Sequence, residues 1–194
     1  MKLGMVVRNM GPQATAATLV ACARAAEAAG LDDVWVVDHV AIPPDDAEGS
    51  DGRHLDPLAT LAFLAGATAR IGLGTSVLIL PYRPPLPTAK AIATIQELSG
   101  GRLRLGVGVG WMGADPAALR APIAALRERF TQAGRPPPQV VAMGRLPLED
   151  APRARAQLAE LSQNGVTGIV HGGERYADAG GFARTAERLA GLAG

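Results

Sequence analysis

The 194-residue chain has little cysteine and almost no net charge: one cysteine, Cys22, and a formal charge of +1. A single cysteine excludes an intramolecular disulfide and a C-x-x-C redox pair. The near-neutral charge gives no sign of the basic surface with which proteins bind nucleic acid, so no nucleic-acid partner is expected. Every apolar run is shorter than the roughly 18 residues that suggest a membrane-spanning helix, so no membrane partner is expected. The N-terminal residues lack a basic segment and a signal-peptide cleavage site, which predicts a cytoplasmic location.

What the sequence does contain is apolar material for one core, because 48% of its residues are hydrophobic. Strand-like runs recur about every 30 residues, the size of a βαβ building unit, and each is followed by a helical pattern. Six such runs are present: Leu3–Val7, Val34–Asp38, Ile71–Leu78, Leu103–Val109, Gln139–Met143 and Val166–Val170. Alternating β and α elements predict an α/β fold with a parallel sheet, which is either open or closed. Cys22 lies at helical spacing with Leu19 and is expected in the core.

The run from Leu103 to Trp111 places glycines on one face of a strand. Gly106, Gly108 and Gly110 alternate with apolar residues, and successive strand residues point to opposite sides of a sheet. Because glycine weakens a buried strand, this face predicts that something packs closely against the backbone. A neighbouring side chain or helix is one interpretation, and a bound molecule is the other. The spacing is not the G-x-G-x-x-G of dinucleotide-binding folds.

A candidate catalytic pair, Asp38 and His39, closes the second predicted strand. Parallel α/β folds bind ligands at the carboxyl ends of their strands. The pair either caps the strand or supplies chemistry, and a regular strand directs only one of the two side chains to the central face. His39 is the better general acid or base, because the ordinary pKa of histidine lies near neutrality. The long loops 41–56 and 80–87 leave the same end of the sheet and are expected to shape a site.

A candidate phosphate site follows the last predicted strand. His171, Gly172 and Gly173 stand where (β/α) barrels often bind phosphate, and Arg175 comes directly after them. At the end of the first strand, Arg8 is either a cavity-lining residue or a surface charge. No metal site is predicted.

Five ordered motifs carry a resemblance to a known family. They are G-T-S-V-L at 74–78, P-x-R-x-P at 81–85, A-K-x-x-A-T at 89–94, L-S-G-G-R at 98–102 and L-G-V-G-V-G-W at 105–111. In this order they resemble the luciferase-like monooxygenase family, and within it the branch that uses coenzyme F420. The similarity runs from Leu3 through Trp111 and resumes more weakly from about Ala125.

The resemblance implies a TIM-barrel-derived fold and a set of cofactor contacts. Asp38 and His39 would lie beside a deazaflavin ring and take part in proton transfer. Ser76 and Val77 would form a bulge with a cis non-proline peptide behind the ring, and Thr75 fits the same pattern. The ring would lie across the glycine face, and Trp111 would form a wall of the pocket. Coenzyme F420 is preferred over FMN because the Asp-His pair and G-T-S-V are typical of that branch.

The chain is also short for this family. An eight-stranded (β/α) barrel takes about 250 residues, whereas this sequence has room for six βα units. We therefore expect a single domain, 1–194, in which two units are deleted between about residues 112 and 125. The deleted part includes the turn that, by resemblance, helps to hold the cofactor phosphate. Six strands would close, stay open or be completed by a second copy of the chain, and dimerisation is the simplest way to cover open edges.

The sequence thus predicts an F420-dependent oxidoreductase that transfers a hydride to or from a small organic substrate. The alternatives are an FMN-dependent monooxygenase and a non-catalytic protein of the same descent that binds a flavin, a deazaflavin or a partner.

Overall fold

The fold alternates strands and helices along the whole chain. The structure, a computed structural model, describes residues 1–39, 49–108, 120–137, 139–172 and 175–192. The strands are β1 (Lys2–Val6), β2 (Asp33–Val36), β3 (Gly72–Ile79), β4 (Leu103–Gly108), β5 (Val141–Gly144) and β6 (Gly168–His171). The helices are α1 (Ala16–Ala28), α2 (Pro57–Ala67), the short 3-10 helix η1 (Leu80–Tyr82), α3 (Pro85–Leu98), α4 (Arg120–Gln132), α5 (Ala151–Gln163) and α6 (Ala179–Ala190). Within the described ranges, the six predicted strands are all found.

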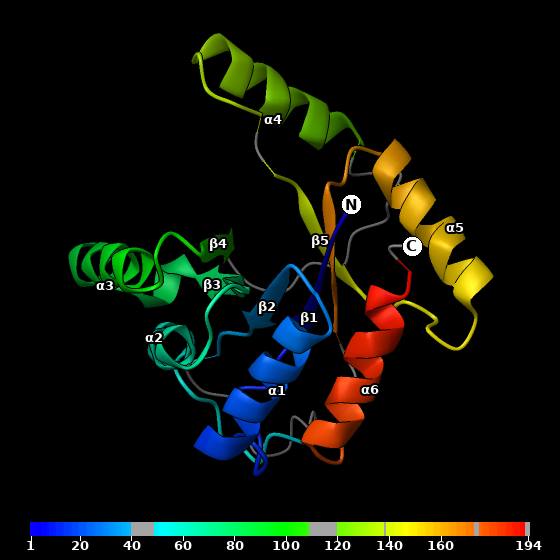
Figure 1. Ribbon diagram of the computed structural model, residues 1–194. Helices are drawn as coiled ribbons and strands as arrows, with labels where there is room; N and C mark the ends of the chain where they lie inside the picture. The colour runs from blue at the N-terminus through cyan, green and yellow to red at the C-terminus, as the bar shows by residue number, and fades with distance from the viewer. Residues whose placement is uncertain (40–48, 109–119, 138, 173–174, 193–194) are drawn as a thin grey trace.

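The six strands form one parallel sheet in the order β4-β3-β2-β1-β6-β5. This order is that of a barrel opened between β4 and β5, which are the two edges. The sheet is strongly curled, because Ser76 Oγ on β3 lies 3.5 Å from Met143 Sδ on β5, although three strands separate them. The expectation of a barrel-like sheet with six βα units is therefore confirmed, and among the described residues the sheet is an open half-barrel (Figure 1).

Helices α1, α2 and α6 lie on the convex face of the sheet, and the concave face holds a small cluster of side chains. On the convex side α1 packs between α6 and α2, and α2 packs on α3 (Figure 1). The main core lies here and includes Cys22, as expected, together with Met5, Leu61 and Phe182. The concave face has a separate cluster of Val6, Trp35 and Val170. The alternation of side chains along each strand separates the two clusters.

Local sequence signals explain where the helices begin and end. Thr15 caps α1, and Asp56 caps α2 by accepting a hydrogen bond from the Ala59 N–H at 2.9 Å. Glycines with positive φ follow α1 at Gly30 and α3 at Gly100, where a left-handed residue ends a helix without steric cost.

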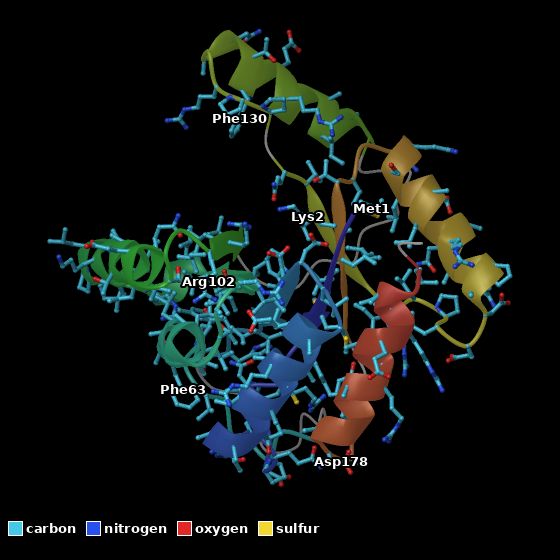
Figure 2. All side chains as sticks on the ribbon, in the orientation of Figure 1. Met1, Lys2, Phe63, Arg102, Phe130 and Asp178 are labelled. Atoms are coloured by element: carbon cyan, nitrogen blue, oxygen red, sulfur yellow. The ribbon has the colours of Figure 1, made fainter. Side chains whose placement is uncertain are left out.

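Two long-range polar contacts tie helix ends to the sheet. Glu27 accepts hydrogen bonds from three successive backbone N–H groups, those of Ala69, Arg70 and Ile71. Arg102, from the L-S-G-G-R motif, donates to the carbonyls of Ala65 and Thr68 at the end of α2, and Figure 2 labels it among the side chains near that helix. Arg102 therefore has a structural role in this motif, because it satisfies carbonyls that a helix end leaves without partners.

Large apolar side chains remain exposed at both edges and on two helices. Leu105 and Val107 on β4 are 42% and 48% exposed, and Met143 on β5 is 48% exposed. Phe63 on α2 projects outward at 46% exposure (Figure 2), and Leu98 ends α3 at 70%. No helix in the described part of the chain is long and apolar enough to cross a membrane.

Candidate functional site

On the concave face of the sheet, the indole of Trp35 packs against glycines of the two neighbouring strands, β1 and β3. A Cβ atom added to Gly74 would lie 2.3 Å from Trp35 Cε3, and one added to Gly4 would lie 2.7 Å from Trp35 Nε1. Both distances are shorter than any real contact, so only glycine fits beside the ring. Trp35 is 5% exposed and closes the bottom of the concave face. The sequence contained this signal as glycines on neighbouring strands, but nothing in it indicated the tryptophan.

Two glycines of β4 fit a bulge in the neighbouring strand β3. A Cβ on Gly106 would lie 2.3 Å from the Thr75 carbonyl oxygen, and one on Gly108 would lie 2.8 Å from Val77 Cγ2. Close contact with neighbouring residues, one of the two interpretations of the glycine pattern, therefore accounts for Gly106 and Gly108. Gly110 lies outside the described residues, as do Trp111 and Gly173.

The bulge itself confirms the expectation drawn from the resemblance. Strand pairing shifts between Thr75 and Leu78, and the Ser76–Val77 peptide is cis. Thr75 is fully buried, and its Oγ1 both donates to the Gly106 carbonyl at 2.8 Å and accepts from the Gly106 N–H at 3.1 Å. The Thr75 hydroxyl thus replaces sheet hydrogen bonds at the bulge. Ser76 and Val77 are half-buried, and Ser76 reaches toward β5 across the concave face.

Asp38 is buried under a guanidinium group. Its carboxylate accepts from Arg83 Nη2 at 2.8 Å, from Arg83 Nε at 3.2 Å and from the Ile79 N–H at 2.9 Å. Arg83 also binds the Asp56 carboxylate at 2.9 Å. The hydrogen bonding that Arg83 donates to the Asp38 carboxylate is the main cause that raises the pKa of Arg83 above its ordinary value. Asp38 therefore fastens the end of β2 to the end of β3.

Arg83 is the residue whose importance the sequence reading missed. It is the arginine of P-x-R-x-P, so the motif signalled it, but a motif does not show what the side chain binds. In the structure it joins the end of β2, the start of α2 and the start of α3 through two carboxylates. Such a bidentate pair of a guanidinium and a buried carboxylate is both strong and geometrically specific.

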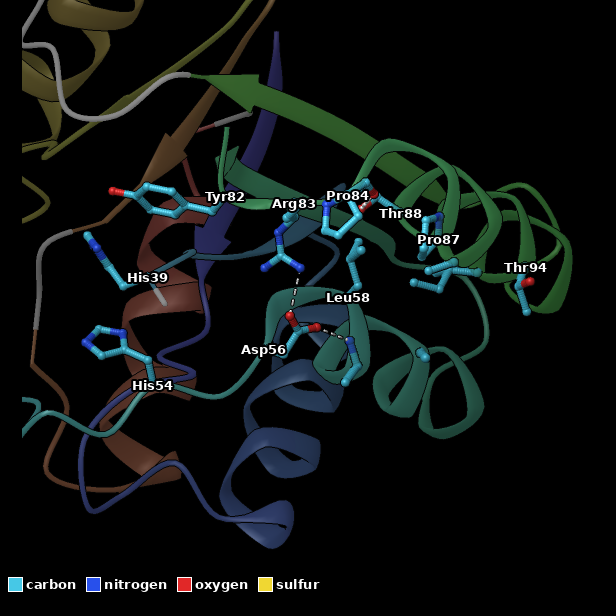
Figure 3. Close-up of a pocket in the computed structure, with 14 residues that line it drawn as sticks. His39, His54, Asp56, Leu58, Tyr82, Arg83, Pro84, Pro87, Thr88 and Thr94 are labelled. Atoms are coloured by element: carbon cyan, nitrogen blue, oxygen red, sulfur yellow. Dashed lines mark hydrogen bonds and ion pairs between the residues drawn. The ribbon is translucent and has the colours of Figure 1, made fainter. Parts of the chain in front are cut away.

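His39 is the second residue of the candidate catalytic pair. It is half-buried and lines a cavity of about 770 Å³ together with His54, Asp56, Tyr82 and Arg83 (Figure 3). The imidazole rings of His39 and His54 meet edge to face, with centroids 5.0 Å apart. The cavity continues between α2 and α3, where Ala62, Ala91 and Ile95 form apolar walls. A cavity of this size suits a small organic molecule.

The predicted phosphate loop begins with a buried histidine. His171 is 0% exposed, and its Nδ1 accepts from the Leu146 N–H at 3.1 Å, so its side chain supports the turn after β5. Gly172 lies on the concave side, where an added Cβ would be 2.9 Å from Val6 Cγ2. A cofactor bound at this loop would therefore contact the backbone after His171 and not the buried His171 side chain.

Arg175 lies in a second cavity, of about 360 Å³, at the ends of β1 and β6. Arg8 and Gln13 line it as well, so the interpretation of Arg8 as a cavity-lining residue agrees with the structure. Asn9, in contrast, is fully buried. The described lining of this cavity carries two guanidinium groups, which favours an anionic ligand.

Comparison with known proteins places this geometry in a family. The family model of luciferase-like monooxygenases matches residues 1–113, more than half of the chain. An F420-dependent glucose-6-phosphate dehydrogenase of Amycolatopsis mediterranei is 45% identical over 93 residues, which cover 47% of this chain and 27% of the relative. An F420-dependent hydroxymycolic acid dehydrogenase of Mycobacterium tuberculosis is 42% identical over 93 residues, covering 47% and 25%. The chain thus spans about a quarter of the length of these two relatives.

Among solved structures, the F420-dependent tetrahydromethanopterin reductase of Methanopyrus kandleri superposes with a TM-score of 0.68 over 97% of both chains, at 13% identity. At this identity the likeness establishes the fold.

Proposed function

Because the chain belongs to the luciferase-like monooxygenase family, we propose that it is an F420-dependent oxidoreductase that transfers a hydride to or from a small organic substrate. Relatives named as F420-dependent dehydrogenases support this choice of cofactor. FMN is the alternative cofactor, and a monooxygenase among the relatives supports oxygenation as the alternative reaction. The observation that carries the proposal is the Ser76–Val77 bulge, held beside the end of the strand that bears His39.

The residues present fit the ring of such a cofactor. A flat ring needs a surface with few projecting side chains, and the concave face offers Gly108 and the half-buried Ser76 and Val77. The Asp38 carboxylate accepts a hydrogen bond from the Ile79 N–H, and this contact keeps the end of β2, next to His39, close to this surface. Thr75 holds the bulge in place through Gly106.

The chain's own residues would then have distinct tasks. A bound deazaflavin supplies the hydride chemistry, while the protein binds and orients it. The bulge would support one face of the ring, and Trp35 would keep the bottom of the concave face closed to water. His39, at the cavity rim, would give a proton to the substrate oxygen or take one from it through an imidazole nitrogen. Asp38 would act as a positioning residue through Arg83 and Ile79.

The phosphate of the cofactor would be held by the Gly172–Gly173 backbone and Arg175, in place of the turn that the chain lacks. The cavity that Arg8 and Arg175 line supports this assignment. FMN and riboflavin differ only in the phosphate, so Arg175→Ala should weaken FMN about tenfold, roughly 1.4 kcal/mol, and leave riboflavin affinity unchanged. Arg155→Ala, at the exposed Arg155 on α5, is the matched control. Equal losses for both ligands would contradict a phosphate contact.

Binding is the first test of the function. Purified protein is titrated with F420 and, separately, with FMN, and fluorescence reports the bound fraction. Micromolar affinity for F420 supports the proposal, whereas soluble protein that binds neither cofactor excludes it and favours a scaffold or partner role. His39→Ala should abolish turnover but weaken cofactor binding by less than about tenfold. Unchanged turnover would make His39 structural.

We also infer that two βα units are missing between residues 112 and 125. The sheet order supports this, because a deletion at that point makes β4 and β5 the two edges, as observed. The family match ends at residue 113, beside the predicted deletion.

A second copy of the chain is the proposed cover for these edges. Unpaired strand edges are normally protected, and Leu105, Val107 and Met143 expose apolar surface there. Size-exclusion chromatography should give a dimer that Val107→Glu converts to a monomer. A monomeric wild type would contradict the dimer without affecting the cofactor assignment.

A further inference from the structure

A second histidine stands beside the proposed catalytic histidine. His54 belongs to the segment before α2, yet its ring meets that of His39 at a centroid distance of 5.0 Å and an angle of 65°. Both rings line the larger cavity (Figure 3). No role in the proposed reaction has so far required His54.

One buried side chain fixes both histidine segments. Asn9, at 0% exposure, donates from Nδ2 to the carbonyls of Val37 and Leu55 at 2.8 Å each, and its Oδ1 accepts from the Val37 N–H at 3.0 Å. Val37 lies two residues before His39, and Leu55 directly follows His54. Asn9 thereby holds the two backbones at a constant separation.

Further contacts immobilise the His54 segment from the other side. Met10 and His54 form an antiparallel bridge, and Arg53 Nη1 donates to the carbonyls of Gly11 and Ala14 at 2.8 and 2.9 Å. The backbones that carry the two imidazoles are therefore held in place by hydrogen bonds on both sides. Pre-organised groups of this kind are typical of catalytic sites.

Several titratable and charged groups surround the pair. Arg83 and Tyr82 face it from η1 and its C-terminal end, Asp56 faces it from the start of α2, and Asp38 lies behind Arg83. The Arg83 guanidinium (+1) and its two carboxylate partners (−2) together carry one net negative charge. A proton on one imidazole repels a second proton on the other.

We propose that His54 is the proton partner of His39, and that the pair relays one proton between bulk solvent and the substrate. In the direction that reduces a substrate, which rests on the proposed function, His39 gives its ring proton to the substrate oxygen. The neutral His54 then takes up a proton from bulk solvent and passes one through a bridging water to the vacated His39 nitrogen, which leaves His54 neutral again. Each transfer leaves one imidazole charged or both neutral, so the site never holds two adjacent imidazolium ions.

The test is a histidine NMR titration of the protein without cofactor. The chain has three histidines, so the ring Cε1–Hε1 signals are assigned from single substitutions. In the wild type, the His39 and His54 curves should each extend over two protonation steps. In His54→Gln, the His39 curve should become a single step, because the second imidazole that repelled its proton is gone. An unchanged His39 curve would overturn the proposal.

The buried His171 supplies an internal control. Its signal should keep its position in His54→Gln, which shows that the fold is intact. If that variant does not fold, the wild-type titration curves are sufficient for the test. Two independent single-step curves for His39 and His54 would refute the coupling between them. Because no cofactor is present, a failure of F420 binding leaves this test unaffected, and uncoupled histidines leave the F420 titration unaffected.

Discussion

The contact between Arg83 and Asp38 gives the sharpest prediction about stability. Arg83→Met keeps the length of the side chain but removes the charge, and it leaves a carboxylate that is 1% exposed without its counterion. Removing one partner of a buried ion pair typically lowers the free energy of unfolding by about 3–5 kcal/mol. Because the Arg83 side chain is 15% exposed, water reaches part of the pair, and we expect a loss of about 3 kcal/mol.

The measurement is urea unfolding followed by tryptophan fluorescence, since Trp35 is buried in the concave cluster. Asp56→Ser is the matched control: it removes the exposed carboxylate on the other side of Arg83 but keeps a capping oxygen for α2, and it should cost less than about 1 kcal/mol. The double variant Asp38→Asn with Arg83→Met retains an acceptor for the Ile79 N–H and should recover about 2 kcal/mol relative to Arg83→Met.

Two results would refute this reasoning. One is an Arg83→Met protein within about 1 kcal/mol of the wild type, because the pair would then contribute no more than a surface ion pair. The other is a double variant as unstable as the single one, because the cost would then not come from an uncompensated buried charge. Arg83→Met should also weaken F420 binding, since the end of β2 that carries His39 loses its attachment to β3.

Three further predictions concern the scaffold. Burial acts to raise the pKa of Glu27, but hydrogen bonds from the Arg70, Ile71 and Ala69 N–H groups outweigh it and lower the pKa. This stabilisation is present above pH 4.5 and is lost as the pH falls below that value. Glu27→Gln should therefore cost about 1 kcal/mol at pH 7, after allowance for screening, and progressively less in acid; a difference independent of pH would contradict this. Burial, followed by the charge of Asp178, raises the pKa of Cys22 to about 11, so a thiol reagent at pH 7 should modify Cys22 only in unfolded protein, and rapid labelling of native protein would count against a buried thiol. Gly74→Ala should reduce the free energy of unfolding by at least about 1–3 kcal/mol, because the added Cβ would meet the Trp35 ring. Gly66→Ala in α2 has open space around its Cβ and should raise the free energy of unfolding by about 1 kcal/mol. Thermal unfolding measures both, and equal effects would show that the Trp35 ring moves aside.

Much of the fold followed from patterns that act over a few residues. Strand-like apolar runs placed all six strands to within a few residues. Thr15 and Asp56 cap α1 and α2 by accepting from the N–H three residues on, and left-handed glycines follow α1 and α3. These signals are readable because a capping bond or a left-handed residue involves neighbours in the chain. Family motifs added the bulge at Ser76–Val77, which no local pattern shows.

The site depended on contacts between distant parts of the chain. Arg83 binds Asp38 across 45 residues, Asn9 binds Val37 across 28, and Ser76 approaches Met143 across 67. Trp35 packs on glycines of two other strands, and the His54 ring meets that of His39, which comes earlier in the sequence. The sequence determined the βα repeat, the strand ends and the residue types that stand there. Only the curl and order of the sheet decided which of those residues meet, because side chains far apart in sequence interact only after the strands between them have packed.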